Sequence, residues 1–200
     1  MPRRARLALA GIPWHIIQRG NNRSACFYHQ EDYLFFLEQL ELQAETFGCQ
    51  VHAYCLMTNH VHLLVTPAES ESASLMMKNL GQRFVQFINR TYQRTGTLWE
   101  GRFKSCITQE DQHVLSCYRY IELNPVRAGM VDHPQDYQWS SFSFNGAGQP
   151  NSLISPHPLY SNLAVDSGER LLAYQELIKS ALSEREINAI RSATNGNFVL

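Results

Sequence analysis

The chain has 200 residues and a formal net charge of −1, and 44% of its residues are hydrophobic. This size and composition suit one globular domain with a core of its own, plus an appendage. No run of about eighteen apolar residues occurs, which excludes a membrane-spanning helix, and five scattered cysteines without a Cys-x-x-Cys zinc pattern indicate reduced thiols in a cytoplasmic protein.

The first predicted elements follow a basic and then briefly apolar segment, 1–10, whose apolar part is too short for a signal peptide. Period-two alternation and turn residues predict strands, and apolar residues at helical spacing predict helices between them. The expected strands are 11–19, 51–57, 60–66 and 103–108, and the expected helices are 31–48 and 72–94. This β-α-β-β-α-β order is the ferredoxin-like split βαβ pattern of the α+β fold class.

The second half of the chain is predicted to be helical. A third helix is expected over about 111–124 and carries Tyr120. Residues 141–158 are rich in Ser, Gly, Asn and Pro and read as a linker or long loop. Two short helices are expected to follow, over about 167–181 and 183–193. We therefore expect an extra tyrosine-bearing helix and a helical C-terminal appendage on the sheet.

Two histidines lie two residues apart in the apolar strand 60–66. Side chains at i and i+2 leave a strand on the same face, so His60 and His62 point one way and the apolar residues between and after them point the other. Both helices of the predicted fold cover one sheet face, so we expect the histidines on the opposite face, which is free to hold a metal ion and receive a ligand. The alternative is a pair of histidines hydrogen-bonded to their neighbours.

A second motif contains Tyr118, Tyr120 and Asn124. Tyr120 and Asn124 are four residues apart and share a helix face. Tyr118 and Tyr120 lie about 200° apart around a helix, so they cannot both face one site. Asn124 precedes Pro125 and also suits a helix cap, a role that does not exclude a functional one.

Together these motifs resemble the HUH single-tyrosine transposases of the IS200/IS605 type, and most closely the REP-associated branch. The resemblance covers about 12–142. Besides His60-Val-His62 and Tyr120-Ile-Glu-Leu-Asn124, the stretches that carry it in family order are 19–23, 99–103, 124–129 and 139–141.

This resemblance implies metal-dependent nicking and rejoining of single-stranded, REP-like hairpin DNA through a 5′-phosphotyrosine. Tyr120 would be the nucleophile. His60, His62 and Asn124 would hold Mg²⁺ or Mn²⁺, with Asn124 where many relatives carry Gln. The resemblance further implies an HUH transposase catalytic domain over 1–144, a linker and helical tail over 145–200 that ends abruptly, a nucleoid-associated cytoplasmic location, no membrane, and action as a monomer or homodimer.

Basic residues are segregated along the chain despite its near-neutral total. Residues 1–30 hold five arginines and no acid, and 78–130 hold eight basic residues against four acids. Such a distribution allows contact with phosphates, although a solvated basic face is the plain alternative for a helix over 78–94. Trp99 or Phe103 would be available to stack a base. The candidate DNA-binding residues are Arg3, Arg4, Arg6, Arg83, Arg90, Arg94, Arg102, Lys104, Arg119 and Arg127.

Three other functions use parts of the same residue set. A rolling-circle-type replication nickase would use the same histidines and tyrosine, but the stretch 124–129 favours the REP-associated branch. A domesticated protein would bind hairpin DNA without cutting it, and the intact core residues argue against that loss. A zinc hydrolase using His60, His62 and Cys55 leaves Tyr120 unexplained and lacks a positioned carboxylate base.

Overall fold

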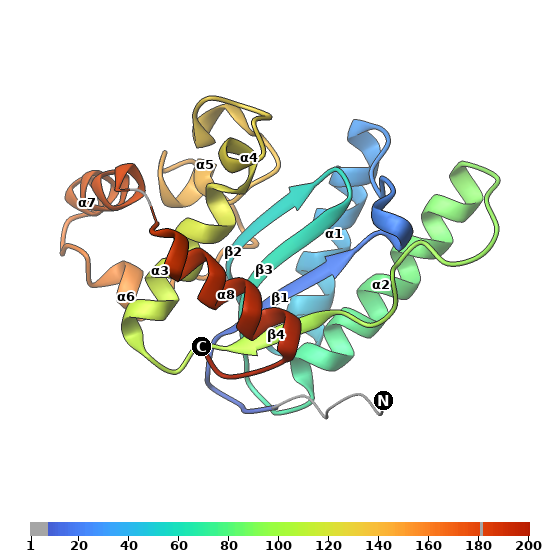
Figure 1. Cartoon of the computed structure of the whole chain (residues 1–200), viewed down its shortest axis with the longest axis horizontal. Helices are drawn as coiled ribbons and strands as arrows, with labels where there is room; N and C mark the ends of the chain where they lie inside the picture. Colours follow the sequence, from blue (N-terminus) through green and yellow to red (C-terminus); the bar gives the residue numbers. More distant parts are fainter. Residues whose placement is uncertain (1–7, 181) are drawn as a thin grey trace.

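The computed structural model describes residues 8–180 and 182–200. Its first half is a four-stranded antiparallel sheet of order β2-β3-β1-β4 with two intervening helices (Figure 1). The elements are β1 (Trp14–Arg19), α1 (Gln30–Thr46), β2 (Cys49–Met57), β3 (His60–Pro67), α2 (Ser72–Thr91) and β4 (Lys104–Ile107). This order confirms the predicted α+β class and the ferredoxin-like arrangement.

The remaining elements are helical. Some cover the other face of the sheet, and others lie beyond its β2 edge (Figure 1). They are α3 (Asp111–Glu122), α4 (Asn124–Arg127), α5 (Phe142–Asn145), α6 (Pro158–Ser161), α7 (Ser167–Lys179) and α8 (Glu184–Gly196), with short 3₁₀ turns at η1 (Asn21–Arg23) and η2 (Pro134–Asp136). Among the residues that the structure describes, no helix is both long enough and apolar enough to cross a membrane.

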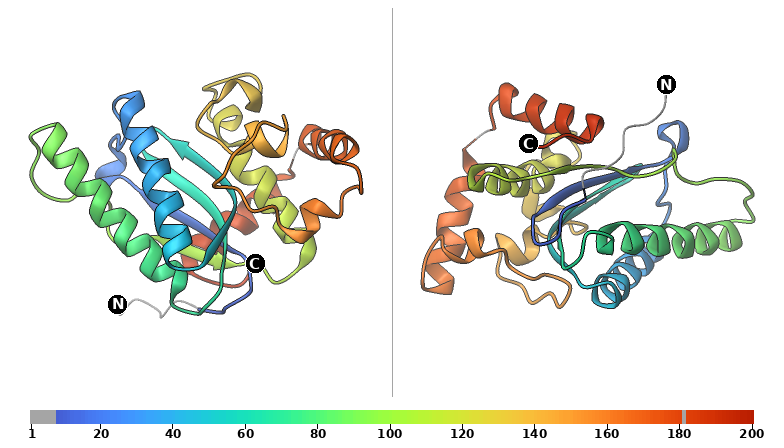
Figure 2. Two further views of the ribbon diagram at one scale, coloured as in Figure 1. Left: turned by 180° about the vertical axis from the view of Figure 1, so that it is seen from behind. Right: turned by 90° about the horizontal axis from the view of Figure 1, so that it is seen from below.

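One face of the sheet packs on α1 and α2, as Figure 2 shows in its right-hand view. Val61, Leu63 and Val65 of β3 are fully buried in this layer with Phe36 of α1 and Phe84 of α2. Complete burial of such side chains stabilises a fold by roughly 1.5–3 kcal/mol each. The alternation of side chains along β3 therefore determines which face of the strand packs on α1 and α2, because a one-residue shift in register would place the histidines in this core.

The opposite face carries the histidines, as expected, but it is covered rather than free. Figure 2 shows α3 and α8 on that side of the sheet. His62 is only 1% exposed. The expectation of a free face is therefore wrong. The physical reason is the amphipathic helix α8, which buries Ile187, Ile190 and Thr194 when it packs there.

The residues after the sheet pack tightly on it. Ile178 and Ile190 belong to the same buried cluster as Leu64 of β3 and Ile121 of α3. The segment expected to be a linker contains α5, and Ser155 donates its backbone N–H to Val51 O at 2.8 Å along the β2 edge. The division into a domain over 1–144 and a tail over 145–200 stays a prediction.

A buried carboxylate joins α3 to the segments that follow it. Glu122 is 0% exposed. It accepts hydrogen bonds from Ser141 Oγ, from Asn145 Nδ2 at 2.8 Å and from the Tyr174 hydroxyl at 2.6 Å. Burial raises the pKa of Glu122 from 4.5 to about 7, although these three hydrogen bonds act in the opposite direction. The packing of α5 and α7 on α3 thus depends on an ionisable group.

Replacing this carboxylate is expected to change how stability depends on pH. Because the pKa of Glu122 is higher in the folded chain than the ordinary value of 4.5, its contribution is full below pH 4.5 and is lost as pH rises through 7. The free energy of unfolding of Glu122→Gln minus that of the parent should therefore increase by about 3 kcal/mol from pH 5 to pH 8. Urea unfolding at both pH values measures it. The exposed Glu38→Gln is the control, and a difference that stays constant with pH would contradict the prediction.

Candidate active site

A cavity of about 260 Å³ lies between the sheet and the helices α3 and α8. The β1–β3 register aligns Ile17 with His62 and Arg19 with His60, so both strands present side chains to it. The residues that line it are His15, Ile17, Arg19, His60, His62, Tyr120, Asn124, Arg191, Thr194 and Asn195. The structure thus brings together all four residues predicted for catalysis and metal binding.

His60 presents an unprotonated nitrogen to this cavity. Its Nδ1 lies 2.6 Å from Asn59 Oδ1, and Asn59 Nδ2 donates to Arg23 O at 3.0 Å. That second bond defines which end of the amide is oxygen, so His60 Nδ1 carries the hydrogen. Burial, followed by the Arg19 charge, lowers the pKa of His60 to about 4. The neutral ring then has a lone pair on Nε2, for which the described residues offer no hydrogen-bond donor.

His62 is held by another histidine. Its Nδ1 lies 2.9 Å from Nε2 of His15, a β1 residue. Burial lowers the pKa of His62 well below its ordinary value, and the neighbouring histidines add to the effect. His60 and His62 meet edge to face, with ring centroids 4.9 Å apart. Both rings are therefore neutral at pH 7, which is the form that binds metal ions.

The helix α3 places Tyr120, and not Tyr118, against the histidines. The Tyr120 ring packs edge-on against His15 and His62, with centroids 5.6 Å away in each case. Tyr118 is fully buried, and its hydroxyl accepts a hydrogen bond from His157 N at 3.2 Å on the far side of the helix. The angular separation expected from the helical repeat thus distinguishes the two tyrosines.

Asn124 supplies an amide to the same cavity. It is the first residue of α4, and the N-cap position before it is Leu123, so the structure gives no support to Asn124 as the helix cap. Its Nδ2 is buried without a partner among the described residues. This nitrogen is a donor, so a cation would be bound through the acceptor Oδ1 of the same amide, beside the two neutral imidazoles. The residues present are therefore a suitable ligand set with room for further ligands.

A zinc site built on cysteine is not supported. Within residues 8–180 and 182–200 there is no cluster of three or more His, Cys, Asp or Glu side chains suited to a metal ion. Cys55 is absent from the cavity lining, and its Sγ donates to Met57 Sδ at 3.5 Å. Burial raises the pKa of the Cys55 thiol well above its ordinary value, which disfavours the thiolate that binds zinc.

Arg127 packs on the candidate nucleophile. Its guanidinium carbon lies 4.4 Å from the centroid of the Tyr120 ring, and Nη2 donates to the Tyr120 carbonyl. Its Nε and Nη1 are buried and have no partner in the described part of the chain. A buried guanidinium with unused donors is suited to an anion, since charged donors gain most from a charged acceptor.

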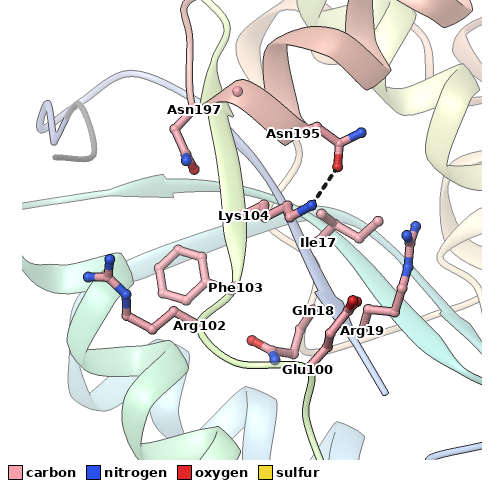
Figure 3. Close-up of a pocket in the computed structure, with 10 residues that line it drawn as sticks. Ile17, Gln18, Arg19, Glu100, Arg102, Phe103, Lys104, Asn195 and Asn197 are labelled. Atoms are coloured by element: carbon pink, nitrogen blue, oxygen red, sulfur yellow. Dashed lines mark hydrogen bonds between the residues drawn. The ribbon is translucent and has the colours of Figure 1, made fainter. Parts of the chain in front are cut away.

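A second cavity of about 440 Å³ adjoins the first and shares Ile17, Arg19 and Asn195 with it. Figure 3 shows its lining, in which Arg19, Arg102 and Lys104 outnumber the single acid Glu100. Lys104 Nζ donates to Asn195 Oδ1 at 2.9 Å. A basic groove thus leads along β4 to the histidines.

Other predicted DNA contacts lie elsewhere. Arg83 and Arg90 are exposed on α2, on the opposite side of the sheet. Arg94 donates to the Tyr28 hydroxyl at 2.8 Å. Arg119 is buried and donates to Ser180 O and Oγ, which ties α3 to the end of α7. Their roles in binding stay predictions. Arg3, Arg4 and Arg6 lie outside the described residues. Of the two proposed stacking residues, Trp99 is buried in the core, whereas Phe103, also largely buried, lines the second cavity (Figure 3).

Sequence reasoning missed His15 and the contributions of α8. His15, Ile17 and Arg19 alternate along β1 with the core residues Trp14 and Ile16, so strand periodicity would have placed His15 on the face of His62. For Arg191, Thr194 and Asn195, the sequence of α8 contains no signal for the neighbour on which the helix packs.

The site thus contains a tyrosine that faces a histidine pair on a ferredoxin-like sheet. Residues 9–124 match the model of the family described as transposase IS200 like, and the chain belongs to this family. Its members are DNA-cleaving transposases.

Two similar proteins carry names that are more specific than the description of the family. A Haemophilus influenzae protein, named as a candidate REP-associated tyrosine transposase, is 26% identical over 108 residues, or 49% of this chain and 61% of that protein. The chain thus spans less than two thirds of this curated relative. A solved REP-associated tyrosine transposase bound to a REP hairpin is 19% identical, with a TM-score of 0.65, and the match covers 78% of this chain and 93% of that one. It confirms the fold.

Proposed function

We propose that this protein nicks and rejoins single-stranded hairpin DNA of the REP type, with Tyr120 as the nucleophile. The observation that carries the proposal is the meeting of Tyr120, two neutral histidines and the Asn124 amide in one cavity. Both relatives described above are REP-associated tyrosine transposases by name, and one was solved with a REP hairpin. We further propose a nucleoid-associated cytoplasmic location and action as a monomer or homodimer.

The proposed first step is attack of the Tyr120 hydroxyl oxygen on a backbone phosphorus. The new O–P bond forms as the bond from phosphorus to the 3′ oxygen breaks, and the tyrosine loses a proton while the leaving oxygen gains one. The products are a 5′-phosphotyrosine and a free 3′-OH. Attack by a 3′-OH on the phosphotyrosine reverses the step, so rejoining needs no nucleotide cofactor.

His60, His62 and Asn124 would hold a divalent ion in this site. When bound, Mg²⁺ or Mn²⁺ would neutralise charge on the phosphate, and the two imidazoles favour Mn²⁺. The chain itself contributes the ligand geometry. The neutral forms of both histidines leave Nε2 lone pairs for the ion, and the free donors of Arg127 are suited to the phosphate joined to Tyr120.

The basic groove supplies a path for the strand that enters the site. Arg19 borders both cavities, and Arg102 and Lys104 extend the positive charge along β4. Phosphate contacts of this kind bind DNA without reading sequence and weaken as salt rises. We therefore propose that the groove holds the single strand next to the hairpin.

A second candidate function is hairpin binding without cleavage. The observation that favours it is the burial of Tyr120, which is only 6% exposed beneath the helices that cover the sheet. Cleavage requires a phosphate to reach this hydroxyl, whereas binding in the groove does not. The same experiment separates the two candidates.

Incubation of the full chain with end-labelled hairpin oligonucleotides and Mn²⁺ tests the proposal. A covalent adduct that carries the 3′-end label is expected, together with a released fragment that carries the 5′-end label and a free 3′-OH. EDTA should abolish the adduct. An adduct with the 5′-end label would overturn the proposed polarity. Hydrolysed ends without an adduct would exclude the tyrosine, and binding alone would favour the second candidate.

A further inference from the structure

A series of hydrogen bonds runs from the C-terminal helix α8 to His62. Thr194 Oγ1 donates to Ile190 O at 2.7 Å, one turn earlier in α8. His15 Nδ1 lies 2.9 Å from the same Thr194 oxygen, and His15 Nε2 lies 2.9 Å from His62 Nδ1. Thr194, His15 and His62 are all at most 3% exposed. The series is therefore shielded from water and depends on these partners.

The direction of each hydrogen bond follows from what each atom can donate. Thr194 has a single hydroxyl hydrogen, and Ile190 O can only accept, so that hydrogen is committed to the carbonyl. Towards His15, Thr194 Oγ1 must then accept, and His15 Nδ1 is the donor. The Cys106 thiol, 3.2 Å from the same oxygen, can donate to it without disturbing this order.

The second half of the series follows from the burial and the partners of His15. This ring is 1% exposed, and its two nitrogens face Thr194 Oγ1 and His62 Nδ1, so no carboxylate is bonded to it that would stabilise an imidazolium. A neutral His15 with its hydrogen on Nδ1 has an accepting Nε2. His62 Nδ1 must therefore donate, and the lone pair of His62 lies on Nε2.

We propose that Thr194 and His15 are positioning residues that hold His62 in the Nδ1–H form and so leave Nε2 available to a divalent ion. This inference rests on the proposed function. Partners of this kind commonly fix the orientation and tautomer of a ligating histidine. Asn59 does the same for His60, so both proposed ligands present Nε2. Thr194 lies beyond residues 9–124, which match the family model.

Loss of the Thr194 hydroxyl should reverse the direction of the hydrogen bond between His15 and His62. A buried His15 Nδ1–H without an acceptor is costly, whereas moving that hydrogen to Nε2 restores a bond by donating to His62 Nδ1. His62 would then carry its own hydrogen on Nε2, in direct competition with the metal ion. Thr194→Val keeps the shape of the side chain and removes the hydroxyl, so it isolates this effect.

Two measurements on the full chain test the inference. Long-range ¹H–¹⁵N NMR of the metal-free protein reads which nitrogen of His62 is protonated, and calorimetry measures Mn²⁺ binding. Thr194→Val should shift His62 towards Nε2–H and weaken Mn²⁺ binding by about ten-fold or more. Thr194→Ser, which keeps the hydroxyl, should behave like the parent. Ser192→Val, which introduces a valine at an exposed position of the same helix, should also behave like the parent.

The possible outcomes are distinct. A folded Thr194→Val protein that keeps the parental His62 tautomer, or that shifts it without losing Mn²⁺ affinity, overturns the inference. Should Thr194→Val not fold, His15→Phe removes the acceptor of His62 and carries the same expected shift and loss of affinity. A parent protein that binds no Mn²⁺ would refute the proposed metal site, and a parental His62 protonated on Nε2 would refute the series itself.

Discussion

Tyr120→Phe should lower covalent adduct formation by at least about a thousand-fold and leave hairpin binding unchanged. The variant loses only the hydroxyl, because a phenyl ring can keep the edge contacts with His15 and His62 and the stacking of Arg127. Denaturing gels quantify the adduct, and gel-shift titrations with the same hairpin measure binding. The substitution therefore distinguishes covalent adduct formation from hairpin binding.

Tyr118→Phe is the matched control for this prediction. It removes a hydroxyl that accepts a hydrogen bond from His157 N, so the variant should lose about 1 kcal/mol of stability. The cavity should be unchanged. Parental adduct yields are expected. Loss of the adduct in Tyr118→Phe, with activity retained in Tyr120→Phe, would show that the nucleophile was wrongly assigned.

Substitution of either proposed histidine ligand should remove metal-dependent cleavage. We expect His60→Ala and His62→Ala to lower both the Mn²⁺ affinity and the adduct yield by about 100-fold or more, because each removes a ligand of the ion that would neutralise the phosphate. Calorimetric titration with Mn²⁺ measures the affinity without DNA. Unchanged Mn²⁺ affinity in both variants would place the metal elsewhere.

The two histidines should differ in their effect on folding. A histidine on a free sheet face would be dispensable for stability, but His62 is 1% exposed and bonded to His15. His62→Ala should therefore cost about 1–3 kcal/mol, and the half-buried His60 should cost less. His52→Gln is the matched control. This buried histidine bonds Ser155 O and Thr66 Oγ1 away from the cavity, so the variant should lose stability and keep Mn²⁺ binding.

Much of the sheet and part of the site follow from local periodicity. Alternation along β3 is enough to place His60 and His62 on one face, because successive strand residues point to opposite sides. The helical repeat is enough to separate Tyr118 from Tyr120. The order of strand-like and helix-like segments predicts the ferredoxin-like unit, since each hydrophobic stripe needs a covering layer.

The tertiary structure alone decided how that unit is completed. The sequence by itself determined that α8 is amphipathic and that His15 lies in a strand, but Thr194 and His15 are 179 residues apart, and no local pattern specifies that they meet. Their contact depends on the surface against which the apolar face of α8 packs, and many apolar surfaces would suit the same pattern of residues. The covered face of the sheet, the burial of Tyr120 and the partner of His62 all result from that packing.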